Sequence, residues 1–422
     1  MSHIAPWTIS TDCASTAATS PRWVSPARQR STCGTSPSSM TCLDIGQWRI
    51  ARPECASPVL RISPSTQLQS RAKTTNEKRE ESMMKERSAA DAGRQGWLGS
   101  ELVHDKSWIY PLSQADIGEI DTALRTFKAT GKPLEEMRKE DFPLRALAAR
   151  AKEYVDEIRN GRGFVVLRGL PVRDYSDEDA GIVFYGLGLY LGQPLRQNPR
   201  GDLLGHVFDQ GRKFGRQDVR GYQTRAHLPF HTDSCEIVGL LCLRPAKSGG
   251  ASSISSSVAV YREIEQRHPG YLAALHQGYR YIRREAASTS AAVTEYPVPV
   301  YGVQDGVVSC RFIPTQIEAA AEKLGEPITG TAREAFEAVV KLSADAPFRL
   351  DMDLQQGDIQ LVNNYTVLHS RTEYEDWPEP GRERHMIRLW LGFEEPWPIA
   401  PGFARPKGYL MGGSVQLGLD AA

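Results

Sequence analysis

The order in which helical and strand patterns follow one another constrains the fold of this chain more than any other feature. Between residues 113 and 192, three segments place apolar residues at helical spacing, and only the short apolar run 163–170 reads as a strand. From about residue 220 the pattern changes to strands with helical insertions. Helices first and strands later predict one mixed α/β domain around an antiparallel sheet or barrel, because a βαβ array would alternate the two patterns throughout.

Capping and turn residues predict several element boundaries. Helix starts are expected at Ser113 with Asp116, at Ser176 with Asp179 and at Thr331 with Glu334. The first three helices are expected to end near Gly131, Asn160-Gly161 and Gly192. Asp305-Gly306 predicts the turn of a hairpin. Further strands are predicted within 227–243, 251–257, 355–364 and 384–393.

The N-terminal segment differs in composition from the rest of the chain. Residues 1–75 are rich in Ser, Thr, Pro and Arg, and their only acidic residues are Asp12, Asp44 and Glu54. Such a segment lacks the patterned apolar residues that a core needs, so we expect residues 1–90 to be a disordered or targeting tail and residues 97–410 to form the folded domain. The sequence leaves open a transit peptide, a plain disordered tail, and a start assigned upstream of Met83 or Met84. We expect a cytoplasmic protein, or a mitochondrial one if the tail is a transit peptide.

Charge and cysteine content exclude several classes of protein. The chain has 51 basic and 51 acidic residues, so we expect no nucleic-acid or membrane partner. No apolar run approaches the roughly 20 residues that span a bilayer. Seven cysteines, an odd number, argue against a disulfide scaffold and for a reducing compartment. Four of them lie in the tail at wide, irregular spacing, which disfavours a zinc module there.

The segment HLPFHTDSC, residues 227–235, contains two ligand-capable side chains two positions apart. Residues i and i+2 of a strand point to the same face, so we expect His231 and Asp233 to project together and Thr232 to face away. One His and one carboxylate are two of the three ligands in the facial triad of non-haem Fe(II) oxygenases. His369 is the best candidate for the third ligand, because it follows a predicted strand and precedes a polar loop. A hydrogen-bonded structural histidine is the alternative.

Two arginines in the segment RHMIRLWL strengthen the case for an anion-binding site. Arg384 and Arg388 are four residues apart, and on a strand they share one face with Met386 and Trp390. Buried guanidinium groups need anionic partners, and their planar shape suits two parallel hydrogen bonds to a carboxylate. Ion pairs with acidic side chains of the protein are the alternative.

The combination of these segments, in this order, resembles a known enzyme family. FHTD (230–233), KSGGAS (247–252), VNNYTVLHSRT (362–372) and RHMIRLWL (384–391) resemble the Fe(II)/2-oxoglutarate-dependent dioxygenases of the taurine dioxygenase (TauD/TfdA) family. The resemblance covers roughly residues 160–395. It implies a double-stranded β-helix (jelly-roll) core of the clavaminate synthase-like type with flanking helices. It further implies an enzyme that uses Fe(II), 2-oxoglutarate and O2 to hydroxylate or otherwise oxidise a small organic substrate, releasing succinate and CO2.

The resemblance also implies roles for individual residues. It assigns iron binding to His231, Asp233 and His369. Ser252 stands where the family usually has a Thr that contacts 2-oxoglutarate, and it keeps the hydroxyl. Arg384 matches the Arg that pairs with the distal carboxylate of 2-oxoglutarate, and Arg388 matches one that lies near the co-substrate or an anionic substrate group. The loop before Arg384 is a few residues longer than in the taurine enzymes, so the resemblance leaves open which of the two arginines takes which role, with Arg382 as a third choice.

Substrate contacts are less constrained by the sequence. His227 lies four residues before His231 on the same predicted strand face, and His206 and Gln223 lie in the preceding loop region. For each of them, a role in shaping the loop is the alternative. Weaker candidates are Tyr222, Arg225 and Arg311. The substrate is expected to be a small molecule. The sequence leaves open whether it carries a carboxylate or other anionic group, and whether the protein forms a homo-oligomer.

Other functions remain open at this point. A non-catalytic binding protein of the same fold would need neither the complete triad nor both arginines. A metal-dependent hydrolase could use the same ligands with zinc, but the sequence has no HExxH motif. A cysteine nucleophile is a further option, although Cys235 and Cys242 lie in an apolar strand and are expected in the core.

Overall fold

The computed structural model describes residues 95–403 except 199, 214–218, 220, 283–291 and 402, all within one compact unit. The predictions for the tail fall outside the described residues. Within the described part, no helix combines the length and the apolar character needed to cross a membrane.

A large, mostly antiparallel sheet forms the base of the site. Its strand order is β1-β2-β12-β6-β15-β3, and β4 pairs with β15 beside β3. Its strands are β1 (Ile109–Pro111), β2 (Phe164–Arg168), β3 (Gln193–Leu195), β4 (Leu204–Val207), β6 (Ile237–Arg244), β12 (Ile359–Asn363) and β15 (His385–Gly392). Only β1 and β2 pair in parallel among these strands.

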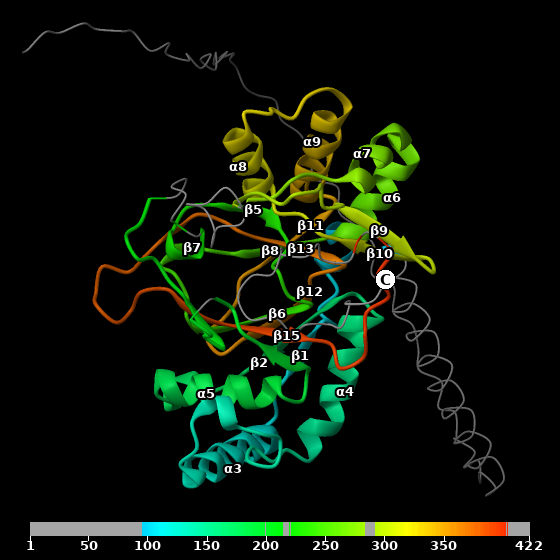
Figure 1. Cartoon of the computed structure of the whole chain (residues 1–422). Helices are drawn as coiled ribbons and strands as arrows, with labels where there is room; N and C mark the ends of the chain where they lie inside the picture. The colour runs from blue at the N-terminus through cyan, green and yellow to red at the C-terminus, as the bar shows by residue number, and fades with distance from the viewer. Residues whose placement is uncertain are drawn as a thin grey trace, which may run out of the picture. The chain divides into compact units, whose positions relative to one another are not determined.

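A second sheet lies across from the first (Figure 1). Its order is β11-β8-β13-β5, with every pair antiparallel. Its strands are β5 (Leu228–His231), β8 (Ser252–Ser256), β11 (Arg349–Met352) and β13 (Val367–Arg371). Two further pairs are β7 (Ser248–Gly249) with β14 (Tyr374–Glu375), and β9 (Tyr301–Gln304) with β10 (Val307–Cys310).

Helices cover the outer faces of both sheets (Figure 1). The large sheet packs against α3 (Gln114–Thr130), α4 (Ala146–Arg159) and α5 (Asp177–Gly188). On the side of the smaller sheet lie α6 (Ser257–Arg267), α7 (Leu272–Gln277), α8 (Pro314–Leu324) and α9 (Gly330–Ala344), while the short α2 (Gly99–Leu102) contacts β11.

The alternation of side chains along each strand produces three apolar layers. In β15, Ile387 and Leu389 join the core beneath the helices, whereas Trp390 joins the cluster between the two sheets. On the opposite sheet, Ile254 and Val367 contribute to the same inter-sheet cluster. Strands buried on both faces explain why the β segments are so apolar. At one end of the space between the sheets, charged and polar side chains join the apolar ones around a cavity, and this is where the site lies.

Most of the predicted boundaries agree with the structure. Ser113 and Asp116 form the expected capping box, with Asp116 N–H donating to Ser113 Oγ at 3.3 Å. Asp305 and Gly306 have φ of 53° and 78° at the turn between β9 and β10, as the hairpin requires. The cap expected at Thr331 with Glu334 is wrong, because α9 begins at Gly330 after Thr329 and makes no side-chain cap.

Two further expectations concern the helices and the cysteines. α5 ends at Gly188 rather than near Gly192, and the chain continues through turns. Glycine is a poor helix former, so the GLGLYLG segment supports helix weakly. Cys235 and Cys242 are buried, as expected. Burial raises the pKa of the Cys242 thiol to about 12, which disfavours a nucleophilic thiolate.

Candidate metal centre

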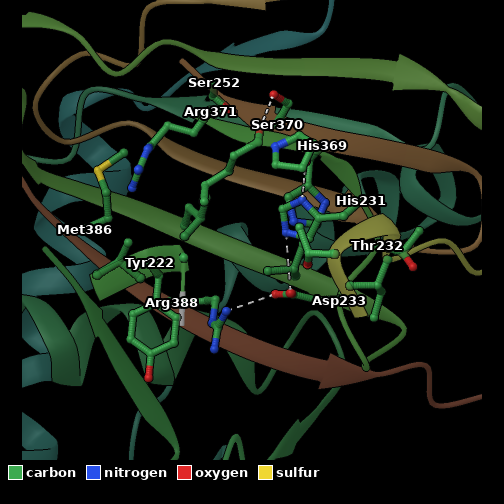
Figure 2. Close-up of a pocket in the computed structure, with 18 of the residues that line it drawn as sticks. Tyr222, His231, Thr232, Asp233, Ser252, His369, Ser370, Arg371, Met386 and Arg388 are labelled. Carbon is green, nitrogen blue, oxygen red and sulfur yellow. Dashed lines mark hydrogen bonds and ion pairs between the residues drawn. The ribbon is translucent and has the colours of Figure 1, made fainter. Parts of the chain in front are cut away.

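His231 and His369 lie opposite each other on neighbouring antiparallel strands. In the pairing of β5 with β13, the two residues are direct partners. Side chains opposed in this way have Cβ atoms about 4.5–5.5 Å apart. The two imidazole centroids are 4.4 Å apart and face the same cavity (Figure 2). Strand register alone therefore brings two nitrogen ligands together.

The position of His369 on its strand differs from the expected one. It is the central residue of β13 rather than a residue near a strand end, and the preceding strand β12 ends at Asn363. No strand was predicted at residues 367–371, because His369 and Arg371 place polar side chains on the face that in a core strand would be apolar. The same i, i+2 spacing could have identified Arg371, which the sequence analysis did not single out.

Asp233 lies two residues beyond the end of β5 and is fixed by neighbouring segments. Its backbone N–H donates to Asn364 Oδ1 at 3.0 Å. Its Oδ2 accepts hydrogen bonds from Trp390 Nε1 at 2.9 Å and from Arg388 Nη1 at 3.2 Å. The other oxygen, Oδ1, lies 3.9 Å from His231 Nε2. One carboxylate oxygen is thus held by the protein, and the other is presented to the imidazoles.

Thr232 and His231 both make hydrogen bonds that fix their side chains. Thr232 faces away as expected, and its hydroxyl accepts from the backbone N–H of Phe312 at 3.1 Å. His231 Nδ1 lies 2.8 Å from the carbonyl oxygen of Pro229. A carbonyl only accepts, so Nδ1 carries the proton and Nε2 keeps its lone pair.

The electrostatics of the site favour metal-binding protonation states. Burial and, to a lesser extent, the charge of His231 lower the pKa of His369 to about 3. Burial would raise the pKa of Asp233, but the charges of Arg388, His369 and His231 bring it to about 2. Near neutral pH the site therefore holds a neutral His369 imidazole and an ionised Asp233 carboxylate, the forms that coordinate metal ions.

These three side chains fit an Fe(II) ion. One ligand atom from each of His231, Asp233 and His369 lies within 4.8 Å of the others. Nδ1 of His369 is buried and has no hydrogen-bond partner. Two imidazoles and one carboxylate are the donor set of the facial triad of non-haem Fe(II) enzymes.

β15 presents both predicted arginines to the cavity. Arg384 immediately precedes the strand, and it lines the cavity together with Met386, Arg388 and Trp390, as the alternation predicts. Arg388 donates from Nε to Gln197 Oε1 at 2.8 Å and from Nη1 to Asp233. The guanidinium of Arg388 is therefore already paired with a carboxylate.

Arg384 and Arg371 differ from Arg388 because they are buried and form no ion pair with an acidic side chain of the described residues. Their exposed fractions are 4% and 6%, and both guanidinium groups lie against the ring of Tyr374, at 5.1 and 4.8 Å from its centroid. Nη1 of Arg384, and Nε and Nη1 of Arg371, have no hydrogen-bond partner. Burial lowers the pKa of both, and the charge of Arg384 helps to bring that of Arg371 to about 10. Two buried cations with unused donors indicate an anion site.

The KSGGAS segment makes room for this pair. Gly250 has φ of +71°, and a Cβ at this position would lie 3.0 Å from Arg384 Nε. Ser252 lines the same cavity, and its hydroxyl donates to Gln360 Oε1 at 2.9 Å. To donate to a bound carboxylate, the Ser252 hydroxyl must leave this bond.

The three residues expected to contact substrate lie outside the cavity lining. His206 Nδ1 is 2.8 Å from His385 Nε2, and Gln223 Nε2 donates to Gln210 Oε1 at 3.1 Å. His227 is exposed, because the pairing of β5 with β13 contains a register shift between Leu228 and His231 that breaks the alternation assumed for the strand.

Of the weaker candidates, only Tyr222 lines the cavity. Arg225 pairs with Asp209, Arg311 lies over Phe403, and Arg382 pairs with Glu379. The cavity has a volume of about 150 Å³. Apolar residues of both sheets and the start of α8 form its remaining walls, including Leu240, Ile313 and Pro314.

Comparison with known proteins points in the same direction as this geometry. The family model of taurine catabolism dioxygenases, TauD/TfdA family, matches residues 130–390. FR-33289 synthase from Streptomyces rubellomurinus is 28% identical over 308 residues, which cover 72% of this chain and 90% of that protein. A taurine hydroxylase-like protein from Stachybotrys chartarum is 28% identical over 73% of this chain and 82% of its own. Uridine-5'-phosphate dioxygenase from an Amycolatopsis species is 26% identical over 54% of this chain and 86% of its own.

Solved structures resemble the described fold. Asparagine oxygenase in complex with Fe(II), hydroxyasparagine and succinate aligns with a TM-score of 0.54 at 19% identity, covering 67% of this chain and 93% of that one. The non-haem iron oxygenase OrfP in complex with Fe and α-ketoglutaric acid aligns with a TM-score of 0.51 at 15% identity, covering 67% and 94%. The chain thus has the mixed α/β fold of these oxygenases.

Proposed function

This chain belongs to the TauD/TfdA family of dioxygenases, and from that premise we propose that it oxidises a small organic substrate at the cavity between its two sheets. The protein is a 2-oxoglutarate-dependent dioxygenase, an oxidoreductase whose cofactors are Fe(II), 2-oxoglutarate and O2. The proposed reaction is hydroxylation or a related oxidation, with release of succinate and CO2. The two facing sheets support a double-stranded β-helix, or jelly-roll, as the core of the fold.

The observation that carries the proposal is the convergence of His231, Asp233 and His369. We propose that these three side chains hold Fe(II). Trp390 and Arg388 fix the Asp233 carboxylate through Oδ2, which leaves Oδ1 directed toward the imidazoles. When bound, Fe(II) and 2-oxoglutarate supply the oxidising chemistry.

The unpaired guanidinium of Arg384 is proposed to bind the distal carboxylate of 2-oxoglutarate. It is buried, it has an unused Nη1, and it lies on the cavity wall. Ser252 is proposed to contribute its hydroxyl to the same ligand after exchange from Gln360. Arg388, which the resemblance also placed near the co-substrate, is proposed to act on it indirectly by holding Asp233.

We propose that the substrate carries an anionic group. The described cavity lining contains Arg371, Arg384 and Arg388 but a single acidic residue, Asp233. An electropositive, partly dry cavity attracts anions. Two of the similar proteins are named for taurine, a sulfonate, and for uridine 5'-phosphate. Tyr222 is the proposed substrate contact in place of His206, Gln223 and His227, because it alone of the four lines the cavity.

Single replacements by Ala test the metal assignment. His231→Ala, Asp233→Ala and His369→Ala are each expected to abolish Fe(II) binding in equilibrium dialysis and succinate formation from 2-oxoglutarate, while the proteins remain folded. His104→Ala is the matched control, because His104 is exposed and lies outside the cavity. A His369→Ala protein that binds Fe(II) as tightly as the parent would refute the ligand set.

A further inference from the structure

Arg371 makes hydrogen bonds that a ligand-binding arginine does not need. Its Nη2 donates to the carbonyl oxygen of Thr224 at 2.8 Å and to that of Ala226. Its Nε and Nη1 have no partner. A guanidinium has five N–H donors in a rigid plane, so one side chain can hold two groups in fixed geometry. Arg371 therefore connects the anion site with the segment of residues 221–226.

The start of the segment of residues 221–226 forms part of the cavity wall. Gly221 and Tyr222 line it, and the ring of Tyr222 lies 5.1 Å from the guanidinium carbon of Arg388. Arg388 in turn holds Asp233 (Figure 2). A displacement of this segment would therefore move the wall beside the candidate metal ligands.

The anion site determines how firmly Arg371 can hold that wall. Arg371 and Arg384 lie against the same ring of Tyr374, and no carboxylate of the described residues forms an ion pair with either. Two like charges in a buried site repel each other. A carboxylate bound between them would neutralise this repulsion and occupy the unused donors of Arg371. Its Nη2 would then be held against the carbonyls of residues 224 and 226.

We propose that Arg371 is a positioning residue that couples the distal carboxylate of 2-oxoglutarate to residues 221–226, so that co-substrate binding fixes the Tyr222 wall of the substrate cavity. This inference rests on the proposed function, because it takes 2-oxoglutarate as the anion. If a substrate contacts the fixed wall, 2-oxoglutarate strengthens substrate binding by some factor. By thermodynamic linkage, the substrate must then strengthen 2-oxoglutarate binding by the same factor.

Backbone amide hydrogen exchange of residues 221–226 measures the coupling without turnover. The full-length protein is loaded anaerobically with Fe(II), and exchange is compared with and without saturating 2-oxoglutarate. The dissociation constant of 2-oxoglutarate is measured separately from the absorbance of its Fe(II) complex. The variants are Arg371→Lys, Arg371→Gln and Arg384→Lys. Arg162→Lys is the matched control, because Arg162 is half-buried and paired with Glu157 outside the cavity.

The two cavity arginines are expected to separate affinity from coupling. In the parent and in Arg162→Lys, 2-oxoglutarate slows exchange in residues 221–226. Arg384→Lys weakens 2-oxoglutarate binding about tenfold to a hundredfold, the value of a charge-assisted hydrogen bond, yet keeps the slowing at saturation. Arg371→Lys keeps a cation near the carboxylate and binds 2-oxoglutarate within about tenfold of the parent, but loses the slowing, because an ammonium cannot span both carbonyls and the ligand.

The outcomes distinguish this inference from the proposed function. A parent protein that binds no 2-oxoglutarate overturns both. A parent that binds 2-oxoglutarate with no change in exchange at residues 221–226 overturns the coupling alone, and so does an Arg371→Lys protein that keeps the full slowing. Should Arg371→Lys fail to fold, Arg371→Gln decides by the same criterion.

Discussion

Replacing Arg384 by Met is predicted to stabilise the protein in the absence of ligands, although it removes a proposed binding residue. Arg384 is 4% exposed, and the structure gives its guanidinium no acidic partner to offset the loss of hydration. The nearby charge of Arg371 adds repulsion. Methionine retains much of the apolar stem and places no charge in the site. Arg388→Met is the matched opposite case, because it removes the ion-pair partner of Asp233 on the same strand face.

The expected magnitudes follow from this difference in pairing. Replacing buried charges by well-packed apolar groups stabilises proteins by about 1–4 kcal/mol, and losing the contact of Arg384 with Tyr374 offsets about 1 kcal/mol. The net gain is therefore up to about 3 kcal/mol, and each kcal/mol corresponds to about 2–4 °C in Tm. Arg388→Met leaves a half-buried carboxylate that keeps only its bond to Trp390, so a loss of about 2–4 kcal/mol is expected.

Thermal unfolding with and without 2-oxoglutarate is the assay. Without ligand and with metal removed by chelation, the expected order of Tm is Arg384→Met, parent, Arg388→Met. With Fe(II) and 2-oxoglutarate at a hundred times the parent's dissociation constant, the parent gains about 2.7 kcal/mol and Arg384→Met gains little, so the stability difference between them shifts by about 2.7 kcal/mol in favour of the parent. An Arg384→Met protein that is less stable than the parent without ligand would mean that Arg384 is paired in solution, and the anion-site reasoning would fail.

Three further predictions concern other parts of the molecule. Gly250→Ala should destabilise the fold by about 1–2 kcal/mol, because Gly250 has a positive φ. It should also weaken 2-oxoglutarate binding, because the new Cβ would contact Arg384 Nε. An unchanged Tm together with an unchanged dissociation constant would contradict this prediction. Burial, with the charges of His206 and Arg244, lowers the pKa of His385 to about 4, below the unfolded value of about 6.5. The stability linked to neutral His385 is therefore complete above pH 6.5 and is lost as pH falls toward 4. Between these two pH values, the free energy of unfolding measured in urea should fall less for His385→Gln than for the parent, by up to about 3 kcal/mol. A chain that begins at Met84 should keep the succinate-forming activity and Tm of the full chain, and loss of either would move the proposed domain boundary.

Local rules were sufficient for the elements whose pattern is independent of the site. The helix from Ser113 to Gly131 combines a capping box, an apolar stripe and a terminal glycine, and all three appear in the structure. The alternation in β15 likewise predicted which side chains face the cavity. In these segments propensity, burial and turn chemistry favour the same structure.

The candidate site was harder to predict where its function conflicts with local patterns. β13 was misplaced because its cavity face is polar, and Arg371 was missed with it. His227 was assigned to the wrong face because a register shift between paired strands has no local signature. The partners of Arg388 include Gln197, Asp233 and Tyr222 from three separate segments, so its pairing with Asp233 depends on tertiary packing that the sequence alone does not reveal.

Because His231 and His369 are direct partners across β5 and β13, metal affinity depends on the register in which these two strands pair. If β13 slipped by a single residue against β5, Leu368 or Ser370 would stand opposite His231, and the His369 side chain would turn toward the other face of the sheet. An ion that needs both imidazoles would bind only the correctly registered sheet and would favour it by mass action. Metal present during folding should therefore select the correct strand register and raise the yield of native protein. The same metal added after folding should not convert chains that have already paired out of register.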